Sequence, residues 1–155
     1  MKDFSRITSQ LEADFPQFIF CASDDSRWSP TEHKIYFREN LPELFHELGH
    51  AISGHKKFVQ DIELVKMERE AWTCASRISR KYGFEIPEEI IESALDEYRE
   101  WLHTRALCPN CSQTGLQNRE SLAYECLNCG AIWTANDSRK IGLRRHLIPK
   151  NSLQK

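Results

Sequence analysis

The chain has 155 residues, of which 40% are hydrophobic, enough for one sizeable core or for a smaller core with a metal-stabilised appendage. No apolar run approaches membrane-spanning length and the first residues lack the apolar stretch of a secretory signal, so we expect a cytoplasmic protein that makes no membrane contact. The net charge of −2 is unevenly distributed, because residues 139–155 contain basic side chains and no acidic one.

Three segments precede the first strong motif. Apolar residues spaced three or four positions apart over residues 4–11 predict an amphipathic helix. Residues 17–22 (QFIFCA) and 34–38 (KIYFR) are rich in β-forming side chains, whereas residues 24–30 between them, Trp28 included, have the composition of turns. We therefore expect an antiparallel pair of strands, one edge of which can receive a peptide as an added strand.

A second helix is predicted to begin at Asn40. The Asn40 side chain can cap the first turn while Glu43, three residues on, reaches back to complete a capping box. Pro42 suits the first turn of a helix, and Gly54 is a plausible C-terminal stop. Between them, apolar residues at three- and four-residue intervals form one stripe: Leu41, Leu44, Phe45, Leu48 and Ile52.

This helix contains the motif His46-Glu47-Leu48-Gly49-His50. Histidines four residues apart leave the same helix face, about 40° apart, where neutral ring nitrogens can bind one Zn²⁺. Glu47 then lies beside the metal and can take a proton from a water molecule that the metal activates. The motif predicts a zinc metallopeptidase, a hydrolase with Glu47 as its catalytic base. The alternative is a helix that carries two surface histidines at this spacing by chance.

A catalytic zinc usually takes three protein ligands and leaves one position for water. A third histidine on a following turn would stand at residue 56, which is Lys56. The other common solution is a glutamate from the next helix, predicted over residues 60–82. Glu68 falls on the apolar stripe of that helix, where a carboxylate is costly unless it is paired or metal-bound. We expect Glu68 as the third ligand, with Glu70 on the more exposed neighbouring line as the alternative; a plain ion pair of Glu68 with lysine or arginine is a further interpretation.

The segment from His46 to His50, with His55 just after it and Glu68-Arg69-Glu70-Ala71-Trp72-Thr73-Cys74-Ala75 following, resembles the ImmA/IrrE family of small zinc metallopeptidases. Members carry an HELGH-type helix and then a helix of the form Glu-x-x-Ala-Asn-x-Phe-Ala. The resemblance spans roughly residues 15–82 and implies a metal ligand at Glu68, a general base at Glu47, and cleavage of a protein, often a transcriptional repressor. Trp72 and Cys74 depart from the family's pattern, and the Leu-Met-Pro run that often follows is absent.

Four cysteines form a second strong motif. Cys108-Pro109-Asn110-Cys111 and Cys126-Leu127-Asn128-Cys129 are two C-x-x-C turns separated by 14 residues, and each turn is tight enough for both sulfurs to reach a metal at ~2.3 Å. Short strands predicted over residues 122–125 and 131–134 complete a zinc ribbon. Four sulfurs leave no position for water, so this zinc is predicted to be structural. Two disulfides or a redox dithiol are the alternatives, which a reducing cytosol disfavours.

A third helix is predicted over residues 87–103, and the expected fold class is α+β. Residues 1–104 would form a zincin-like metallopeptidase domain, in which short antiparallel strands precede the HExxH helix, the glutamate helix and the third helix. Residues 105–136 would form the zinc ribbon, followed by a basic C-terminal tail over residues 137–155. The expected cofactors are two Zn²⁺ ions, one catalytic and one structural.

The sequence leaves two points open: the oxyanion donor, and whether the ribbon and tail contact nucleic acid. An oxyanion donor is needed near the metal, and the candidates are His55, Tyr36, Tyr98 and His103. His55 can equally be a surface histidine. The ribbon and tail can contact nucleic acid through phosphate-binding side chains and stacking rings. These are Arg139, Lys140, Arg144, Arg145, Trp133 and His146.

Two alternative functions remain. A zinc-protease core followed by a ribbon is similar to SprT-like proteases, which act on DNA-associated proteins, although those proteins generally show a further histidine where this chain offers Glu68. The chain can also be a non-catalytic, zinc-stabilised module that binds nucleic acid or protein. Glu47 argues against that interpretation, because a purely structural site needs no base.

Overall fold

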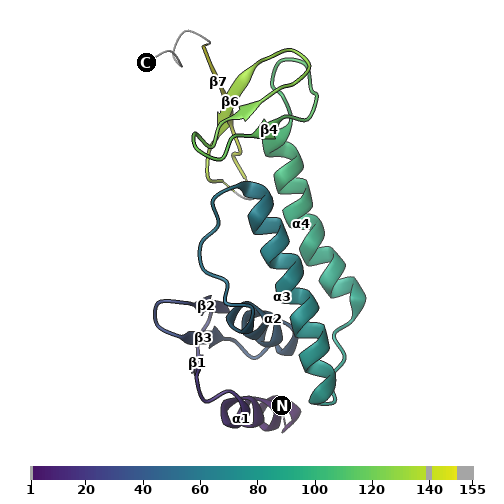
Figure 1. The fold of residues 1–155 in the computed structure, drawn as a ribbon. Coiled ribbons are helices and arrows are strands. Elements are labelled where there is room, and N and C mark those ends of the chain that lie inside the picture. The colour runs from purple at the N-terminus through teal and green to yellow at the C-terminus, as the bar shows by residue number, and fades with distance from the viewer. Residues whose placement is uncertain (1, 139–140, 150–155) are drawn as a thin grey trace. The chain divides into compact units, whose positions relative to one another are not determined.

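The computed structural model describes residues 2–138 and 141–149 and shows an α+β protein there (Figure 1). The helices in this part are α1 (Lys2–Asp14), α2 (Leu41–Ile52), α3 (Asp61–Lys81) and α4 (Glu88–Ala106). One small sheet contains β1 (Ile19–Ala22), β2 (Arg27–Ser29) and β3 (Lys34–Phe37), and the other β4 (Leu116–Gln117), β5 (Tyr124–Glu125), β6 (Ile132–Ala135) and β7 (Arg145–Ile148). None of the described helices is both long and apolar enough to cross a bilayer.

The chain divides into two compact units. The first comprises Met1–Lys57 and Lys66–Ser93, and the second Phe58–Val65 and Ala94–Lys155. The core of the first unit is formed by apolar side chains of α1, β3, α2 and α3: Ile7, Leu11, Ile35, Leu44, Phe45, Leu48, Ala71, Ala75 and Ile78. The four predicted helices are thus present, with ends within a few residues of those expected.

The first sheet has the strand order β1-β3-β2. β1 runs parallel to β3, with Ile19 opposite Lys34, so the predicted antiparallel pairing of residues 17–22 with 34–38 is wrong. The segment predicted as turns contains β2, in which Trp28 pairs antiparallel with Ile35 of β3. This additional strand reverses the chain once more before β3, and β1 therefore meets β3 in the same direction.

Local sequence sets both ends of α2. Asn40 Oδ1 accepts the Glu43 N–H at 3.2 Å, and Gly54 follows the helix with φ +68°, as the sequence predicts. The prediction that the Glu43 side chain reaches back to complete the capping box is wrong. The Glu43 carboxylate pairs instead with the Arg38 guanidinium, 2.6 Å from Nε, because a charged donor binds a carboxylate more strongly than a neutral N–H does.

The backbones of α2 and α3 approach closely at Gly49. A Cβ built on Gly49 would lie 2.3 Å from the carbonyl oxygen of Ala71, closer than packed atoms can stand. Glycine therefore lets the two helices meet at this point. His46 and His50 flank Gly49 on α2, and Glu68 lies one turn before Ala71 on α3, so the same contact brings these three side chains together.

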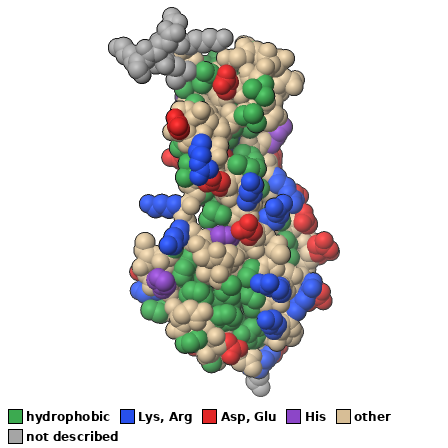
Figure 2. Space-filling view, viewed as in Figure 1, with side chains coloured by type: hydrophobic (Ala, Val, Ile, Leu, Met, Phe, Trp, Pro, Cys, Tyr) green, Lys and Arg blue, Asp and Glu red, His purple; other side chains and the backbone are tan. Residues whose placement is uncertain are grey.

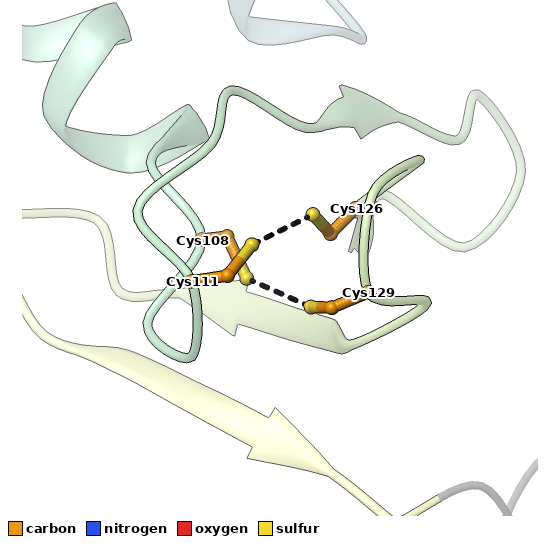
Figure 3. Close-up of side chains that lie close together, drawn as sticks. All are labelled: Cys108, Cys111, Cys126 and Cys129. Atoms are coloured by element: carbon orange, nitrogen blue, oxygen red, sulfur yellow. Dashed lines mark hydrogen bonds between the residues drawn. The ribbon is translucent and has the colours of Figure 1, made fainter.

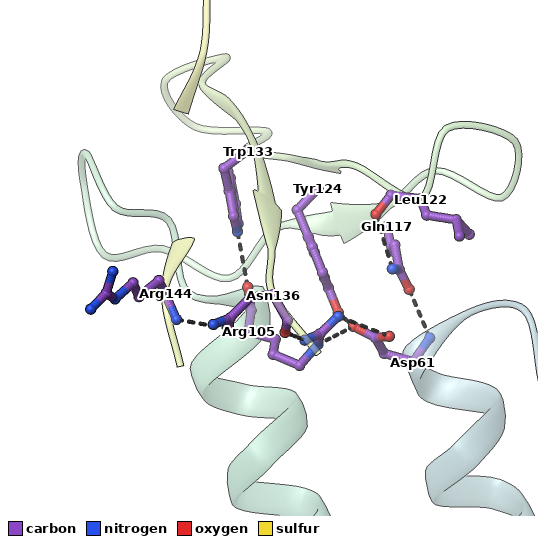
Figure 4. A network of polar contacts seen from close by, with 8 residues as sticks. All are labelled: Asp61, Arg105, Gln117, Leu122, Tyr124, Trp133, Asn136 and Arg144. Atoms are coloured by element: carbon purple, nitrogen blue, oxygen red, sulfur yellow. Dashed lines mark hydrogen bonds and ion pairs between the residues drawn. The ribbon is translucent and has the colours of Figure 1, made fainter. Parts of the chain in front are cut away.

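The second unit contains a buried ion pair, shown in Figure 4. Asp61, 4% exposed, accepts hydrogen bonds from Arg105 Nε and from the Tyr124 hydroxyl, both at 2.6 Å. The Arg105 carbonyl accepts the Trp133 indole N–H at 2.9 Å, and Gln117 Oε1 accepts the Asp61 N–H at 2.7 Å. Burial, together with the Asp61 contact, raises the pKa of Tyr124. This network links the first turn of α3, the end of α4 and the second sheet.

We expect Gly49→Ala to destabilise the protein by roughly 1–3 kcal/mol, the cost of overpacking a tight contact. In an exposed helix the same change stabilises by about 1 kcal/mol, so the sign of the effect is diagnostic. Urea unfolding would measure it, with Ser53→Ala at the C-cap of the same helix as the control. A Gly49→Ala protein as stable as the wild type would mean that the helices separate here without cost.

Asp61→Asn should cost about 3–5 kcal/mol, because it leaves the Arg105 charge buried without its counter-charge. The matched control is Asp96→Asn, which removes an exposed pair with Arg99 and should cost less than about 1 kcal/mol. The free energies of unfolding of both variants would be compared under the same conditions. Similar small losses would contradict a stabilising role for the buried pair.

Candidate metal centres

Three side chains from α2 and α3 converge on one point. His46 Nε2 lies 3.1 Å from His50 Nε2 and 3.2 Å from Glu68 Oε2, and His50 Nε2 lies 3.5 Å from Glu68 Oε1. All three residues are buried, and Glu68 is only 5% exposed. We call this group the His/Glu centre. It unites both motif histidines with the glutamate that the apolar stripe predicts.

The donor atoms of the His/Glu centre fit a small divalent cation. Neighbouring donors in a tetrahedral site with ligand distances of ~2.0–2.1 Å stand roughly 3.3 Å apart, in the middle of the observed range. Oε2 of Glu68 and Nδ1 of His46 are buried and make no hydrogen bond within the described residues. Burial raises the pKa of Glu68, but His46 and His50 outweigh it and bring that pKa to about 2. A charged carboxylate thus faces two imidazole nitrogens, an arrangement that a cation satisfies.

Glu70, the alternative ligand, lies elsewhere. Its side chain is 62% exposed, and its Oε2 stands 3.1 Å from His55 Nε2. His55 itself is 8% exposed, so the interpretation of this residue as a surface histidine is wrong. Its Nδ1 lies 2.9 Å from Nδ1 of His50. His55 and Glu70 therefore lie on the Nδ1 side of His50 and are not among the three converging donors of the His/Glu centre.

Glu47 is partly buried on α2 between the two histidines. Its Oε2 accepts the backbone N–H of Trp28 at 2.6 Å. Burial raises the pKa of Glu47, and the nearby His46 and His50 only partly offset that effect. The Trp28 indole also donates to the His55 carbonyl at 2.9 Å, so β2 holds both the carboxylate and the segment after α2. The sequence places Trp28 in a turn, whereas the structure places it on β2, where it is partly buried; its large apolar side chain was the available signal that it packs against the protein.

Trp72 is a second residue that motif reasoning does not reveal. Its ring stacks on His46, with 4.2 Å between ring centroids and 27° between planes. Trp72 is 5% exposed and follows Glu68 by four residues, so both side chains leave the same face of α3. That spacing was the available signal. Trp72 therefore places an aromatic ring against a metal-ligand candidate.

The other oxyanion candidates are placed as follows. The Tyr36 hydroxyl donates to the Glu32 carboxylate, 3.1 Å from Oε2. Tyr98 and His103 lie on α4 within the second unit, whereas the His/Glu centre belongs to the first. The choice of an oxyanion donor among them therefore stays a prediction.

The four ribbon cysteines form a second group, shown in Figure 3. Cys108 Sγ lies 3.7 Å from Cys129 Sγ, and Cys111 Sγ lies 3.4 Å from Cys126 Sγ. All four sulfurs fall within 4.8 Å of one another. A metal–sulfur distance of ~2.3 Å implies roughly 3.8 Å between sulfurs in a tetrahedron, whereas a disulfide requires ~2.05 Å. The group, here called the Cys₄ centre, fits a metal ion, and its cysteines are free thiols.

Side-chain amides lie next to these sulfurs. Asn110 Nδ2 donates to Cys129 and Asn128 Nδ2 to Cys111, each at 3.5 Å. These contacts are the main reason why the pKa of Cys129 falls to about 6 and that of Cys111 is lowered. Backbone N–H groups lower the pKa of Cys126, but burial and neighbouring thiols raise it to about 11. Part of the group therefore ionises readily, and full ionisation requires a cation.

The second sheet includes part of the predicted basic tail. Residues 145–148 form β7 and pair antiparallel with β6. The Arg145 guanidinium donates to the Leu107 carbonyl and so serves the fold. Arg139 and Lys140 lie outside the described residues. In Figure 2 basic and acidic side chains are interspersed over the visible face rather than gathered by sign.

Trp133 does not provide a stacking surface for nucleic acid, and that prediction is wrong. The residue is 0% exposed, stacks on Tyr124 with 5.6 Å between ring centroids, and forms part of the hydrophobic cluster beside the Cys₄ centre. Gly115 explains the close fit, because a Cβ there would lie 2.4 Å from the Trp133 ring. His146 on β7 does remain exposed.

No protein-family model, curated protein or solved structure matches this chain. Functional assignment therefore depends on the side-chain geometry of the two centres.

We expect the purified protein to bind two metal ions per chain, measured by elemental analysis across the first-row metals. His46→Ala should lose one ion and Cys108→Ser the other, because the two groups share no ligand. Cys21→Ser, which changes a cysteine outside both groups, is the control and should retain both ions. Loss of both ions on either single substitution would show that the centres are not independent.

Proposed function

We propose that this protein is a zinc-dependent metallopeptidase that hydrolyses peptide bonds in a protein substrate. The observation that carries the proposal is the convergence of His46, His50 and Glu68 beside Glu47. Two imidazole nitrogens and one carboxylate at tetrahedral spacing are a donor set typical of catalytic zinc. The resemblance to ImmA/IrrE peptidases supports a regulatory protein as the substrate.

Each side chain of the His/Glu centre has a role in this proposal. His46 and His50 offer neutral nitrogens, and Glu68 supplies one negative charge. Three protein ligands leave a fourth position open to water or substrate. When bound, the zinc ion supplies Lewis acidity toward a water molecule and the peptide carbonyl.

Glu47 acts as the general base. It takes a proton from the attacking water at its carboxylate and then delivers that proton to the leaving nitrogen. Burial supports this role, because a carboxylate whose pKa is raised is a stronger base. The Trp28 N–H holds Oε2 and so fixes the rotation of the carboxylate.

The outer strand β2 supports a path for the substrate. β2 forms one edge of its sheet, and a peptide in extended conformation can pair with such an edge. Trp28 lies on this strand and its N–H is directed to Glu47 rather than to β3. A peptide added along β2 would therefore pass beside the catalytic carboxylate.

The Cys₄ centre is proposed to hold a structural zinc ion. Four sulfurs close the coordination shell and leave no position for water. Cys108 and Cys126 belong to a buried cluster with Ala106, Tyr124 and Trp133, and the other two cysteines pack against that cluster.

The decisive variant is Glu47→Gln, which keeps the shape of the side chain but removes its basicity. We expect the rate of peptide cleavage to fall by about 10²–10⁴-fold while the zinc content stays at the wild-type value. The assay would incubate zinc-loaded protein with a proteome-derived peptide library and identify new peptide ends by mass spectrometry. A diverse library is needed because a narrowly specific peptidase leaves a single generic substrate intact.

Glu85→Gln, an exposed glutamate exchanged in the same way, is the matched control and should cleave like the wild type. Undiminished cleavage by Glu47→Gln would contradict the assignment of Glu47 as the general base. Absence of new peptide ends with the zinc-loaded wild type would contradict the peptidase proposal as a whole.

A further inference from the structure

His55 is held in place from three directions. Gly54, with φ +68°, turns the chain back on α2, and the His55 N–H then donates to the His50 carbonyl at 3.1 Å. The His55 carbonyl accepts the Trp28 indole N–H. The imidazole, 8% exposed, lies between His50 and Glu70. These contacts place the His55 ring between His50 and Glu70.

A metal at the His/Glu centre would determine where the protons of these rings lie. His50 Nε2 faces His46 and Glu68, so a metal at that point requires Nε2 without a proton and places the proton on Nδ1. His50 Nδ1–H then donates to Nδ1 of His55 at 2.9 Å. His55 carries its own proton on Nε2 and donates it to Glu70 Oε2 at 3.1 Å. In that arrangement each of the two contacts, His50 to His55 and His55 to Glu70, holds one proton.

We infer that His55 and Glu70 are positioning residues that fix the tautomer and ring orientation of His50 and so strengthen zinc binding at the His/Glu centre. The inference builds on the proposed function, because it presupposes zinc at that centre. Partners of this kind that accept the second N–H of a ligating histidine raise the basicity of the ligand. Glu70, which sequence reasoning treats as a possible ligand, thus acts one step further out.

His46 provides an internal contrast. Its Nδ1 is buried and has no hydrogen-bond partner in the described residues, and its ring is held by stacking on Trp72. His50 is therefore oriented by the hydrogen bonds that run through His55 to Glu70, here called the relay. His46 is oriented by the face of the Trp72 ring. The Glu70 carboxylate stands at the outer end of the relay, where its negative charge favours donation by His55 and, through His55, by the His50 Nδ1–H.

The test is zinc affinity, measured by competition with a chromophoric chelator on the full chain. We expect His55→Ala and Glu70→Ala each to weaken zinc binding at the His/Glu centre by about 10–100-fold. The Cys₄ centre should keep its affinity and serves as an internal reference. Glu100→Ala, an exposed glutamate on α4, is the control for removal of a carboxylate. The double variant should bind no more weakly than His55→Ala alone, because both residues act through one contact.

Conservative variants separate positioning from general structural support. His55→Gln offers an amide that can both accept from His50 and donate to Glu70, and Glu70→Gln keeps an oxygen that accepts from His55. Both should bind zinc more tightly than the corresponding alanine variants. Because Glu70 is largely exposed on a helix, its alanine variant is expected to fold. Equal losses in the glutamine and alanine variants would contradict the relay.

Nitrogen-detected NMR of the zinc-loaded protein gives a readout independent of affinity. His50 should appear as the Nδ1–H tautomer and His55 as the Nε2–H tautomer; the reverse assignment would overturn the inference. Wild-type zinc affinity in folded His55→Ala and Glu70→Ala would overturn it as well. If His46→Ala, measured in parallel, also leaves zinc content unchanged, the proposed function fails; if His46→Ala loses one ion, only the relay fails.

Discussion

The distance between the backbones of α2 and α3 is the constraint on which the His/Glu centre depends. Gly49 lets the two helices meet because any side chain there would collide with the Ala71 carbonyl. The ligands flank this contact: His46 and His50 stand on either side of Gly49, and Glu68 stands one turn before Ala71. Any separation of the helices would spread donor atoms that now lie 3.1–3.5 Å apart. The contact at Gly49 therefore determines both the packing of α2 against α3 and the spacing of the candidate metal ligands.

Features encoded by neighbouring residues could be predicted from the sequence. The Asn40 cap and the Gly54 stop depend on the local preferences of those side chains, and both are present. The choice of Glu68 over Glu70 followed from helical periodicity, which places only one of the two on the buried face. The C-x-x-C spacing likewise indicated the sulfur group, because each turn brings its own two cysteines together.

Features that depend on distant partners could not be predicted in this way. The parallel pairing of β1 with β3 requires knowledge that residues 27–29 form a strand, and turn-forming neighbours conceal it. Trp133 lies near basic residues, so the sequence suits a nucleic-acid surface as well as a core; burial against Tyr124 decides the matter. The ring of His55 becomes a partner of His50 only through the reversal at Gly54. In each case the position of the residue is decided by a contact with another segment or by a reversal of the chain, which the composition of its own segment does not indicate.

The order of the ligands along the chain has a consequence for synthesis. Every ligand candidate of the His/Glu centre precedes Cys108, and the loop from His46 to Glu68 is short, so the entropic cost of closing it is modest. A chain made from its N-terminus can bring these side chains together before the first ribbon cysteine exists. Asp61, by contrast, is made early but meets Arg105 and Tyr124 only later. The nascent protein therefore carries the Asp61 carboxylate without its Arg105 partner until the rest of the second unit has been made.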